Sequence, residues 1–376
     1  MKKKLRVALF FSSDPTVGGG VQEHIYYLSQ ELRKKGMYVE IFGAETLKTR
    51  FENYTPIGYT VEVPTPNGNW GSVHFLKNGI NLSKFFSSDK FDILHIHEPY
   101  IPFAAWSLIQ NVKIPKVVTF HNAWDDNSIH NAINVIVPMF QPFFSQNVTG
   151  AIFVSKITEK RWRSVCSPKT KTQVINNGVD LKVFKQKKQF RKDKVTELLF
   201  VGRLVKRKGI DYLMKSFPLV KQMCPDTHLT ILGDGPEYEW CRRFIRTNDL
   251  GEDVSLMGKV IGKKKIAYFQ NAHIFCAPYS DEAHPISILE AMACGCTIVG
   301  FANESFKEIL NTYPTPQFLV EHKNIHALKT VLVDAITHRD LQNEASNWCL
   351  EEIKKYSWPS ISTQIEKMYY KVLSKR

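Results

Sequence analysis

Two glutamates, Glu282 and Glu290, lie in the stretch of the sequence that is richest in residues able to do chemistry. The apolar run Ile274–Ala277 predicts a strand just ahead of Glu282, and Pro285 suits the first turn of a helix that carries Glu290. One carboxylate would then hold sugar hydroxyls and the other a ribose, while the helix N-terminus faces a diphosphate. A helix cap at Glu282 and a surface position for Glu290 are the alternative, and the two residues alone leave both open.

A basic loop, Gly202–Gly209, follows the predicted strand Glu197–Val201. It holds four cations within six residues, Arg203 to Lys208. Arginine grips phosphate oxygens in pairs, whereas lysine acts as a point charge. Because glycines bound the loop at the carboxyl end of a strand, it predicts a clamp for a diphosphate; a solvated basic loop is the alternative.

Two further positions follow predicted strands. Gly18–Gly20 lies between the strand Leu5–Phe11 and the helix Gln22–Lys35, where glycines let a phosphate approach the backbone and the free N–H groups of the helix. A flexible strand–helix turn explains the same glycines. His121 follows the strand Lys116–Phe120. This position suggests a role in a cleft, but a purely structural histidine stays open.

Three groupings resemble metal ligands, and each has a simpler explanation. His95 and His97 share one face of a strand but have no third ligand in sequence reach. Asp125–Asp126 fits a helix cap or a solvated pair, and Cys294 and Cys296 are the only close pair among seven scattered cysteines. The sequence therefore predicts no bound metal and no cofactor, in a reduced cytoplasmic environment.

Short apolar strands alternate with helix-patterned segments over nearly all 376 residues, which predicts an α/β fold with parallel sheets covered on both faces. The strand series restarts after the dense basic stretch Lys182–Lys194, so two doubly wound domains are expected. The first comprises residues 1–180 and 358–376, and the second residues 181–357. Ligands bind at the carboxyl ends of strands in such folds, so the domains are expected to share a cleft.

The net charge of +14 favours a phosphate-bearing partner, but charge alone does not choose among a nucleic acid, a lipid head group and a nucleotide. No apolar run approaches the roughly 20 residues that span a bilayer. Basic and aromatic residues of the first domain are candidates for peripheral attachment to an anionic membrane, with a plain surface loop and helix as the alternative. They are Trp70, Phe75, Lys77, Lys84, Phe85 and Phe86.

Taken together, these motifs resemble the family-four retaining glycosyltransferases over nearly the whole chain. The spacing of Glu282 and Glu290, in a Glu-Ala-Met-Ala-Cys-Gly context, resembles the family's glutamate pattern, and Gly202–Gly209 resembles its Gly-Arg…Lys-Gly loop. Ile175–Asp180 resembles its interdomain turn, and Tyr356–Trp358 the point where the chain crosses back to the first domain. Other segments are most similar to the phosphatidylinositol mannosyltransferases and related lipid-linked enzymes: Gly19–His24, His95–Pro99 and Thr119–His121.

The resemblance implies a GT-B fold, in which the first domain binds the acceptor and the second the nucleotide-sugar. It implies a metal-independent hexosyl transfer, with retention, from a UDP- or GDP-sugar to a lipid-linked or glycan hydroxyl. The implied catalytic residues are Glu282 on the transferred sugar, His121 on a sugar hydroxyl, and Arg203 and Lys208 on the departing diphosphate. The implied donor-binding residues are Gly19, Gly20, Gly202, Arg203, Lys208, Gly233, Val260, Glu282, His284, Pro285, Ile286, Ser287 and Glu290, and the acceptor-binding residues are Gln22 and Asn122.

The sequence departs from the family pattern at the donor pocket. Ala283, His284 and Pro285 replace small or aromatic residues with a glycine, and Asn303–Phe306 replaces a glycine pair ahead of Glu308. Two other functions stay open: a sugar-nucleotide epimerase of the same architecture, which needs no acceptor, and a non-catalytic basic protein that binds membranes or nucleic acid. The expected partners are a nucleotide-sugar, a lipid-linked or glycan acceptor and an anionic membrane surface, without nucleic acid, at the cytoplasmic membrane face.

Overall fold

The computed structural model describes residues 3–16, 19–64, 70–122, 144, 146–187, 194–280, 282–321 and 323–374. The chain divides into two compact units, Met1–Asn177 with Trp358–Arg376, and Gly178–Ser357. Residues 178–180, which the sequence assigned to the first domain, belong to the second unit because Val179 forms a parallel bridge with Ser357. Asp125–Asp126, Gly18 and residues 188–193 of the basic stretch lie outside the described residues.

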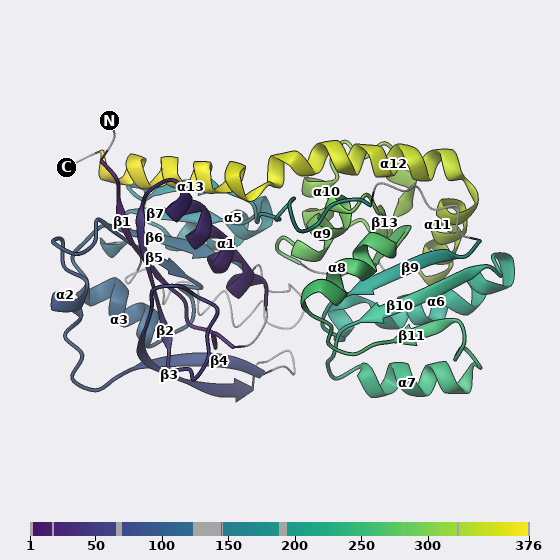
Figure 1. Cartoon of the computed structure of the whole chain (residues 1–376), viewed down its shortest axis with the longest axis horizontal. Helices are drawn as coiled ribbons and strands as arrows, with labels where there is room; N and C mark the ends of the chain where they lie inside the picture. The colour runs from purple at the N-terminus through teal and green to yellow at the C-terminus, as the bar shows by residue number, and fades with distance from the viewer. Residues whose placement is uncertain are drawn as a thin grey trace. The chain divides into compact units, whose positions relative to one another are not determined.

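The described part of the first unit contains an eight-stranded sheet in the order β4-β3-β2-β1-β5-β6-β7-β8 (Figure 1). Neighbouring strands pair in parallel, except for the antiparallel hairpin of β3 and β4. The strands are β1 (Arg6–Phe10), β2 (Tyr38–Ala44), β3 (Tyr54–Pro64), β4 (Trp70–Leu76), β5 (Ile93–His97), β6 (Lys116–Phe120), β7 (Gly150–Phe153) and β8 (Lys171–Val174).

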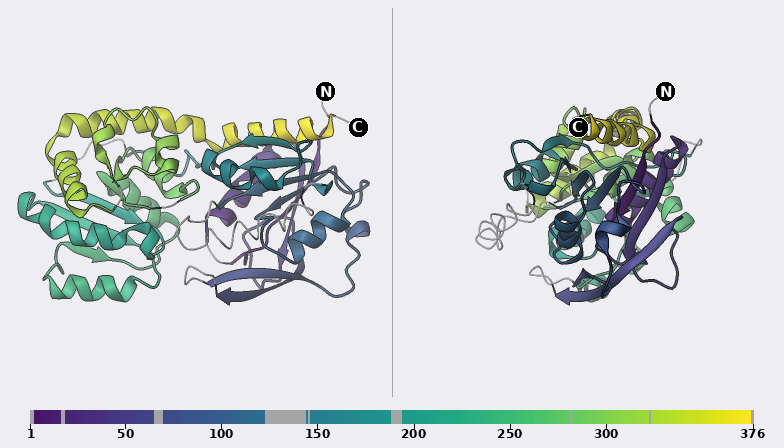
Figure 2. Two further views of the ribbon diagram at one scale, coloured as in Figure 1. Left: turned by 180° about the vertical axis from the view of Figure 1, so that it is seen from behind. Right: turned by 90° about the vertical axis from the view of Figure 1, so that its left-hand side faces the viewer.

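Helices cover both faces of this sheet. Val7 and Leu9 of β1 pack with α1 (Gly20–Lys34) and α13 (Trp358–Leu373), which lie beside each other in Figures 1 and 2. Ala8 and Phe10 pack on the opposite face with α3 (Ala104–Asn111). The short helices α2 (Leu82–Phe85) and α5 (Lys156–Trp162) extend this second layer. Burial on both faces explains why the central strands are continuous apolar runs.

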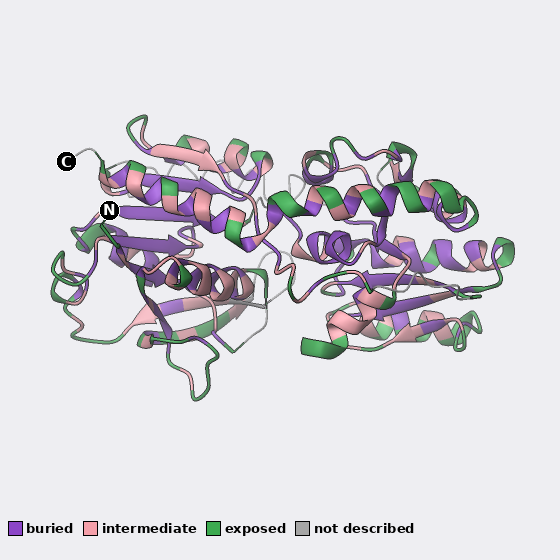
Figure 3. Ribbon diagram, turned by 45° about the horizontal axis from the view of Figure 1, so that its top comes forward, coloured by how far each residue is buried: buried purple, intermediate pink, exposed green. Residues whose placement is uncertain are grey.

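The second unit is built on a six-stranded, fully parallel sheet in the order β11-β10-β9-β12-β13-β14. Its strands are β9 (Thr196–Val201), β10 (Thr227–Leu232), β11 (Val254–Leu256), β12 (Ile274–Ala277), β13 (Thr297–Phe301) and β14 (Leu319–Val320). Its helices are α6 (Ile210–Met223), α7 (Tyr238–Thr247), α8 (Gly262–Asn271), α9 (Ile286–Ala293), α10 (Glu304–Ile309), α11 (Ile325–Thr337) and α12 (Arg339–Glu352). Figure 3 shows buried central strands and half-exposed outer helices in both units.

The strand order of each sheet reverses at one place. The chain winds outward from β1 through β2 and β3 and then returns to β5 on the other side of β1. In the second sheet the reversal lies between β9 and β12. Crossover connections leave in opposite directions at such a point, so the carboxyl ends of the two strands border a ligand crevice. The α/β fold with two doubly wound units, predicted from the sequence, is therefore confirmed.

The predicted membrane-contact residues are partly wrong. Trp70 and Phe75 belong to β4 of the hairpin, so for these two residues the alternative of a plain surface loop is wrong, and membrane contact stays a prediction. Phe86 is fully buried and packs edge-on against Phe42, with ring centroids 4.7 Å apart. The Phe85 ring also contacts the Phe42 ring, so both Phe85 and Phe86 pack inward against Phe42. Among the described helices, none combines the length and apolar character that crossing a bilayer requires.

The return of the chain through α13 predicts a measurable stability effect. Ile365 of α13 is fully buried in the core beneath β1, so Ile365→Ala is expected to cost about 2–5 kcal/mol in urea unfolding of the full chain. Lys367 is exposed on the same helix, and Lys367→Ala is expected to change stability by less than about 0.5 kcal/mol. Equal effects of the two substitutions would contradict the packing of α13 described above.

Candidate active site

The loops after β9 and β12 are joined at the strand reversal of the second unit. The backbone N–H and the hydroxyl of Ser280 both donate hydrogen bonds to the carbonyl oxygen of Arg207, at 2.8 and 2.9 Å. Gly209 ends the basic loop with a φ of +63°, and a Cβ there would lie 1.9 Å from the carbonyl oxygen of Pro278. Only glycine permits this close approach, which holds the basic loop against the loop that carries Glu282.

Glu282 is the anchor of this arrangement. The Nζ atom of Lys208 lies 2.9 Å from Glu282 Oε1, and the Arg207 guanidinium pairs with the same oxygen. Lys208 also lies over the Tyr279 ring, 3.9 Å from its centroid. Burial by itself would raise the pKa of the Glu282 carboxyl, but the charges of Lys208 and Arg207 outweigh burial and lower it. Glu282 is therefore a carboxylate at neutral pH, held by two cations.

The implied cation pair, Arg203 and Lys208, is divided between two environments. Lys208 is buried against Glu282, whereas the Arg203 side chain is exposed at the start of the same loop. Arg207, to which the sequence gave no individual role, pairs with Glu282 instead. The turn of 3-10 helix Lys206–Lys208 places Arg207 and Lys208 on one carboxylate, a local geometry that the density of charge in the sequence did not reveal.

Glu290 is 4% exposed on α9 and is paired with a cation that sequence reasoning missed. Lys265 of α8 places its Nζ atom 2.6 Å from Glu290 Oε1. The surface alternative for Glu290 is therefore wrong. The strand β12 lies between Lys265 and Glu290 in the sequence, and no local motif connects the two residues.

The start of α9 differs by one residue from the prediction. Pro285 is the residue before the helix, and Ile286 is its first residue. The Ser287 hydroxyl lies 3.1 Å from the Tyr279 hydroxyl, which donates to the carbonyl oxygen of Val201 at 2.9 Å. His284 is buried beside the Tyr356 ring, with centroids 5.7 Å apart. The implied donor residues of this segment thus line the end of β9 and the first turn of α9.

Gly202 and Gly233 meet where β9 and β10 end. The N–H of Gly202 donates to the carbonyl oxygen of Leu232 at 3.0 Å, and Gly233 has a φ of +149°. A Cβ on Gly233 would lie 1.8 Å from the carbonyl oxygen of Gly202, so a side chain is excluded. Val260 is half-buried after β11 and packs on the core of this unit.

In the first unit, the predicted residues gather around the strand reversal between β1 and β5. Gly19 precedes α1 and Gly20 is its first residue; both are exposed. Gln22, implied as an acceptor contact, is buried, and its Nε2 donates to the carbonyl oxygen of Asp14 at 3.1 Å. Asn122 is exposed after β6, and its carbonyl oxygen accepts from the Trp162 indole at 2.7 Å.

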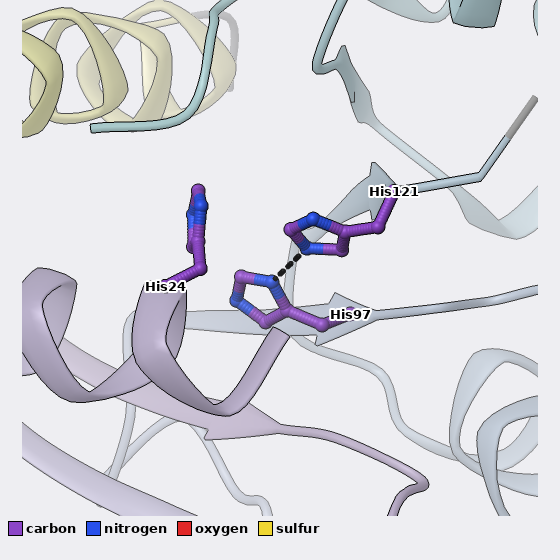
Figure 4. A group of neighbouring side chains, drawn as sticks. All are labelled: His24, His97 and His121. Atoms are coloured by element: carbon purple, nitrogen blue, oxygen red, sulfur yellow. Dashed lines mark hydrogen bonds between the residues drawn. The ribbon is translucent and has the colours of Figure 1, made fainter. Parts of the chain in front are cut away.

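His121 belongs to a cluster of three histidines from three separate elements (Figure 4). His97 Nδ1 lies 2.9 Å from His121 Nε2, and the His24 ring of α1 lies 4.8 Å from the His121 ring. Burial lowers the pKa of His24 to about 4 and holds the pKa values of His97 and His121 well below their usual range. All three rings are therefore neutral at pH 7.

His95 lies outside that cluster in its bonding. Its Nδ1 lies 2.7 Å from the Tyr369 hydroxyl and its Nε2 lies 2.7 Å from the Thr119 hydroxyl. The sequence paired His95 with His97 as the two candidate ligands and found no third ligand nearby. The structure instead groups His97 with His24 and His121, which are far apart in the sequence and meet only through the parallel sheet.

Glu98, which the sequence analysis did not single out as a site residue, directly follows β5 at the strand reversal. Its backbone is left-handed, with a φ of +54°, and its carboxylate accepts from the hydroxyls of Ser13 at 3.2 Å and Tyr100 at 3.3 Å. Burial raises the pKa of the Glu98 carboxyl to about 7, and the two hydroxyls offset only part of this effect. Glu98 therefore titrates near neutral pH beside the β1 loop.

Comparisons with known proteins identify the family of the chain. Residues 18–183 match the family described as Glycosyltransferase Family 4, and residues 182–348 match Glycosyl transferases group 1. A phosphatidyl-myo-inositol mannosyltransferase of Mycolicibacterium smegmatis is 26% identical over 97% of this chain and 93% of its own. A subunit of the phosphatidylinositol N-acetylglucosaminyltransferase of Arabidopsis thaliana is 26% identical over 94% of this chain and 79% of its own.

Solved structures extend the comparison to the fold. The sucrose-phosphate synthase of Thermosynechococcus elongatus superposes with a TM-score of 0.77 at 18% identity, over 99% of this chain and 100% of that one. Anabaena HepE, solved with UDP and glucose, superposes with a TM-score of 0.74 at 15% identity, over 98% of this chain and 100% of that one. The protein is thus a glycosyltransferase with the GT-B fold. Within that class, the chain belongs to the family-four glycosyltransferases.

Glu98 yields a pH-dependent prediction. Its carboxyl ionises near 4.5 when exposed and near 7 when folded, so folding favours the protonated form and stability falls as the pH rises from 4.5 through 7. Ser13 and Tyr100 bond to different oxygens of Glu98, so glutamine keeps an acceptor for one of the two hydroxyls, and it has no proton to lose. Glu98→Gln is therefore expected to gain on the wild type across this window, by on the order of 1–3 kcal/mol at about pH 8.

The measurement is urea unfolding of the full chain at several pH values from about 5 to about 8. Glu62 is exposed on the β3–β4 hairpin, so Glu62→Gln serves as the matched control and is expected to show the same small difference at every pH. A pH-independent difference for Glu98→Gln as well would contradict a raised pKa at this position.

Proposed function

We propose that this glycosyltransferase moves a hexosyl unit from a UDP- or GDP-sugar to a hydroxyl of a lipid-linked acceptor, with retention at the anomeric carbon. The observation that carries the proposal is the ionised Glu282 between Lys208 and Arg207 at the strand reversal of the second unit. Two cations and an acceptor of hydroxyl protons then border the crevice in which open α/β sheets bind ligands.

The cations match the charge that develops on the leaving nucleoside diphosphate. Lys208 is buried against Glu282, so its charge acts in a poorly hydrated setting, where electrostatic stabilisation is strong. The Arg203 side chain is exposed in the same loop. In the proposed complex its guanidinium forms a bidentate contact with phosphate oxygens of the entering donor. We infer that these side chains supply the positive charge without a bound metal.

The two glutamates fit the two polyhydroxylic parts of the donor. In the proposed complex, Glu282 accepts hydrogen bonds from the transferred sugar, while Lys208 and Arg207 turn toward the diphosphate. Glu290 is buried on α9 with Lys265, and in this proposal it accepts from the ribose hydroxyls. In this arrangement the diphosphate pairs with the two cations, and the sugar hydroxyls donate to the Glu282 carboxylate, which offsets part of the cost of separating it from the cations.

The acceptor assignment draws on the first unit and on the names of the relatives. Both relatives described above carry phosphatidylinositol in their names, and both match over more than nine-tenths of this chain. His121, Asn122 and Gln22 lie at the carboxyl edge of the first sheet, with neutral imidazole, amide and helix N–H groups suited to hydroxyls. We therefore propose an inositol phospholipid or a related lipid-linked hydroxyl as the acceptor.

Substitutions in the second unit test the proposed donor chemistry. Glu282→Gln and Arg203→Ala are each expected to lower transfer about 10²–10³-fold, because each removes a charge that acts on the donor. The measurement is formation of glycosylated phosphatidylinositol from the UDP- or GDP-sugar that raises the thermal stability of the wild type. Glu252→Gln and Arg243→Ala, at exposed positions of the same unit, are expected to retain full transfer.

Near-normal transfer by both Glu282→Gln and Arg203→Ala would overturn the donor assignment. Incubation of the wild type with the nucleotide-sugar alone is a further control. A transferase hydrolyses the donor slowly at most, whereas conversion of its sugar to an epimer would show an epimerase.

We also propose peripheral attachment to anionic lipid through an aromatic group on the first unit. Tyr59 of β3 and Phe103 are about half exposed, and the Phe75 ring lies between them with centroid distances of 5.7 and 4.5 Å. Exposed aromatic rings on a protein of charge +14 suit an anionic interface. Phe103→Ser is expected to reduce flotation with anionic liposomes severalfold.

The matched control is Met223→Ser, which removes an equally exposed apolar side chain from the second unit and is expected to leave flotation unchanged. Neutral liposomes are expected to bind the wild type weakly, because they lack the anionic surface. Equal binding to both kinds of liposome, or an equal loss in both variants, would contradict this attachment.

A further inference from the structure

The three histidines of the first unit bring ring nitrogens together without a carboxylate or a cation among them. One nitrogen of each ring lies within 4.8 Å of one nitrogen of the other two. The rings come from α1, from β5 and from the residue after β6, and Figure 4 shows them around a common space. His24 and His97 are fully buried, while His121 is half-buried.

We propose that His24, His97 and His121 form a binding site for a divalent transition metal of the zinc class. The inference concerns a site of this chain that the transfer reaction itself does not require. In a three-histidine zinc site the fourth position is held by water.

The hydrogen-bond pattern already prepares the rings as ligands. His24 Nδ1 lies 3.0 Å from Asn177 Oδ1, and the amide oxygen requires the imidazole to donate from that nitrogen. His24 Nε2 is then an unprotonated nitrogen, and it is buried without a hydrogen-bond partner. Most metal-binding histidines donate a hydrogen bond from the ring nitrogen that does not bind the metal, and this bond fixes the tautomer.

The other two nitrogens are joined by an ordinary hydrogen bond between neutral imidazoles. His97 Nδ1 and His121 Nε2 lie 2.9 Å apart and share a single proton in the neutral pair. Two nitrogens in a tetrahedral zinc site lie about 3.4 Å apart, given zinc–nitrogen distances of about 2.0–2.1 Å. When a metal binds, the shared proton moves to the outer nitrogen of its own ring, and both rings turn so that their inner nitrogens face the metal. The His24 nitrogen lies within 4.8 Å of the other two and moves inward to complete the set.

The ligand set indicates the class of metal. Three neutral imidazoles favour zinc, copper and nickel, whereas magnesium and calcium prefer oxygen ligands. Within the described residues, the seven cysteines are all buried and none belongs to the histidine cluster. Zn²⁺ and Co²⁺ are thus the appropriate probes, and Mg²⁺ is the appropriate negative control.

The site has a consequence for catalysis that rests on the proposed function. If His121 bonds to a sugar hydroxyl, a metal bound to its Nε2 fixes the ring and competes with that contact. Zn²⁺ is therefore expected to inhibit transfer, and a chelator is expected to restore it. Metal binding itself is independent of this role and is measurable on a protein with no turnover.

Binding is tested on the metal-free full chain with Co²⁺, whose visible absorption is intense when it is four-coordinate, and by calorimetry with Zn²⁺. His121→Gln and His24→Gln are each expected to weaken binding by more than about tenfold. Asn177→Ala is expected to weaken it roughly tenfold, because the hydrogen bond that orients the His24 ring is lost. His121 is half-buried, so His121→Gln is the variant least at risk of misfolding; the thermal unfolding of each metal-free variant checks the others.

Two histidines serve as matched controls. His95 lies on the same strand as His97, but both its nitrogens are bonded to hydroxyls, and His338 is exposed on the second unit. His95→Gln and His338→Gln are expected to bind Co²⁺ within about twofold of the wild type. Absorption from sulfur–metal charge transfer would place the metal on a cysteine and overturn the proposal.

The remaining outcomes divide the metal site from the proposed function. Stoichiometric four-coordinate Co²⁺ that is lost in His121→Gln and His24→Gln supports the site, whatever the turnover. Binding that survives both substitutions, or no binding by the wild type, overturns it. Tight Zn²⁺ binding at the cluster without inhibition keeps the site and removes His121 from its proposed role in transfer.

Discussion

The reversal of strand order in each parallel sheet is the constraint on which the sites of this protein depend. A crossover helix covers the sheet on one side of the reversal and the next covers the other side, so the carboxyl ends of β9 and β12, like those of β1 and β5, border a crevice. Loops that follow these strands must turn sharply within a narrow space. Gly209 after β9 and Gly233 after the neighbouring β10 are required because a Cβ at either position would meet a carbonyl oxygen below 2 Å. Backbone geometry thus fixes the loops before any side chain acts.

The side chains at the second reversal then solve an electrostatic problem. Four cations crowd the loop after β9, and like charges at such distances repel one another. Glu282 offsets that repulsion by pairing with Lys208 and Arg207, which also keeps its own pKa low. The ion pair therefore stabilises the ligand-free loop, and the proposed diphosphate would compete with Glu282 for the same two cations.

The sequence predicted what depends on local pattern and missed what depends on distant contacts. Strand–helix alternation gave the two units and nearly all of the central strands, and the position after a strand located Glu282, Lys208 and His121 at sheet edges. The pairing of Lys265 with Glu290 and of His24 with His121 was not predicted, because the partners lie on other elements that come close only when the sheet forms. The β3–β4 hairpin was not predicted, because the aromatic residues Trp70 and Phe75 were interpreted as a membrane surface rather than as part of a strand. Phe86, which was grouped with them, lies in the core. The implied roles of the site residues stay predictions.

The two strand reversals differ in the charge of their side chains, and this difference bears on the proposed division of the reaction between a donor-binding and an acceptor-binding unit. The edge at β9 and β12 carries full charges that pair with each other, which suits a diphosphate whose charge changes during transfer. The edge at β1 and β5 carries imidazoles kept neutral by burial and a carboxyl whose pKa is raised to about 7. Neutral donors and acceptors bind hydroxyls without attracting a competing phosphate. The same neutrality leaves the imidazole nitrogens unprotonated, so a surface suited to hydroxyls is unavoidably also suited to a transition metal.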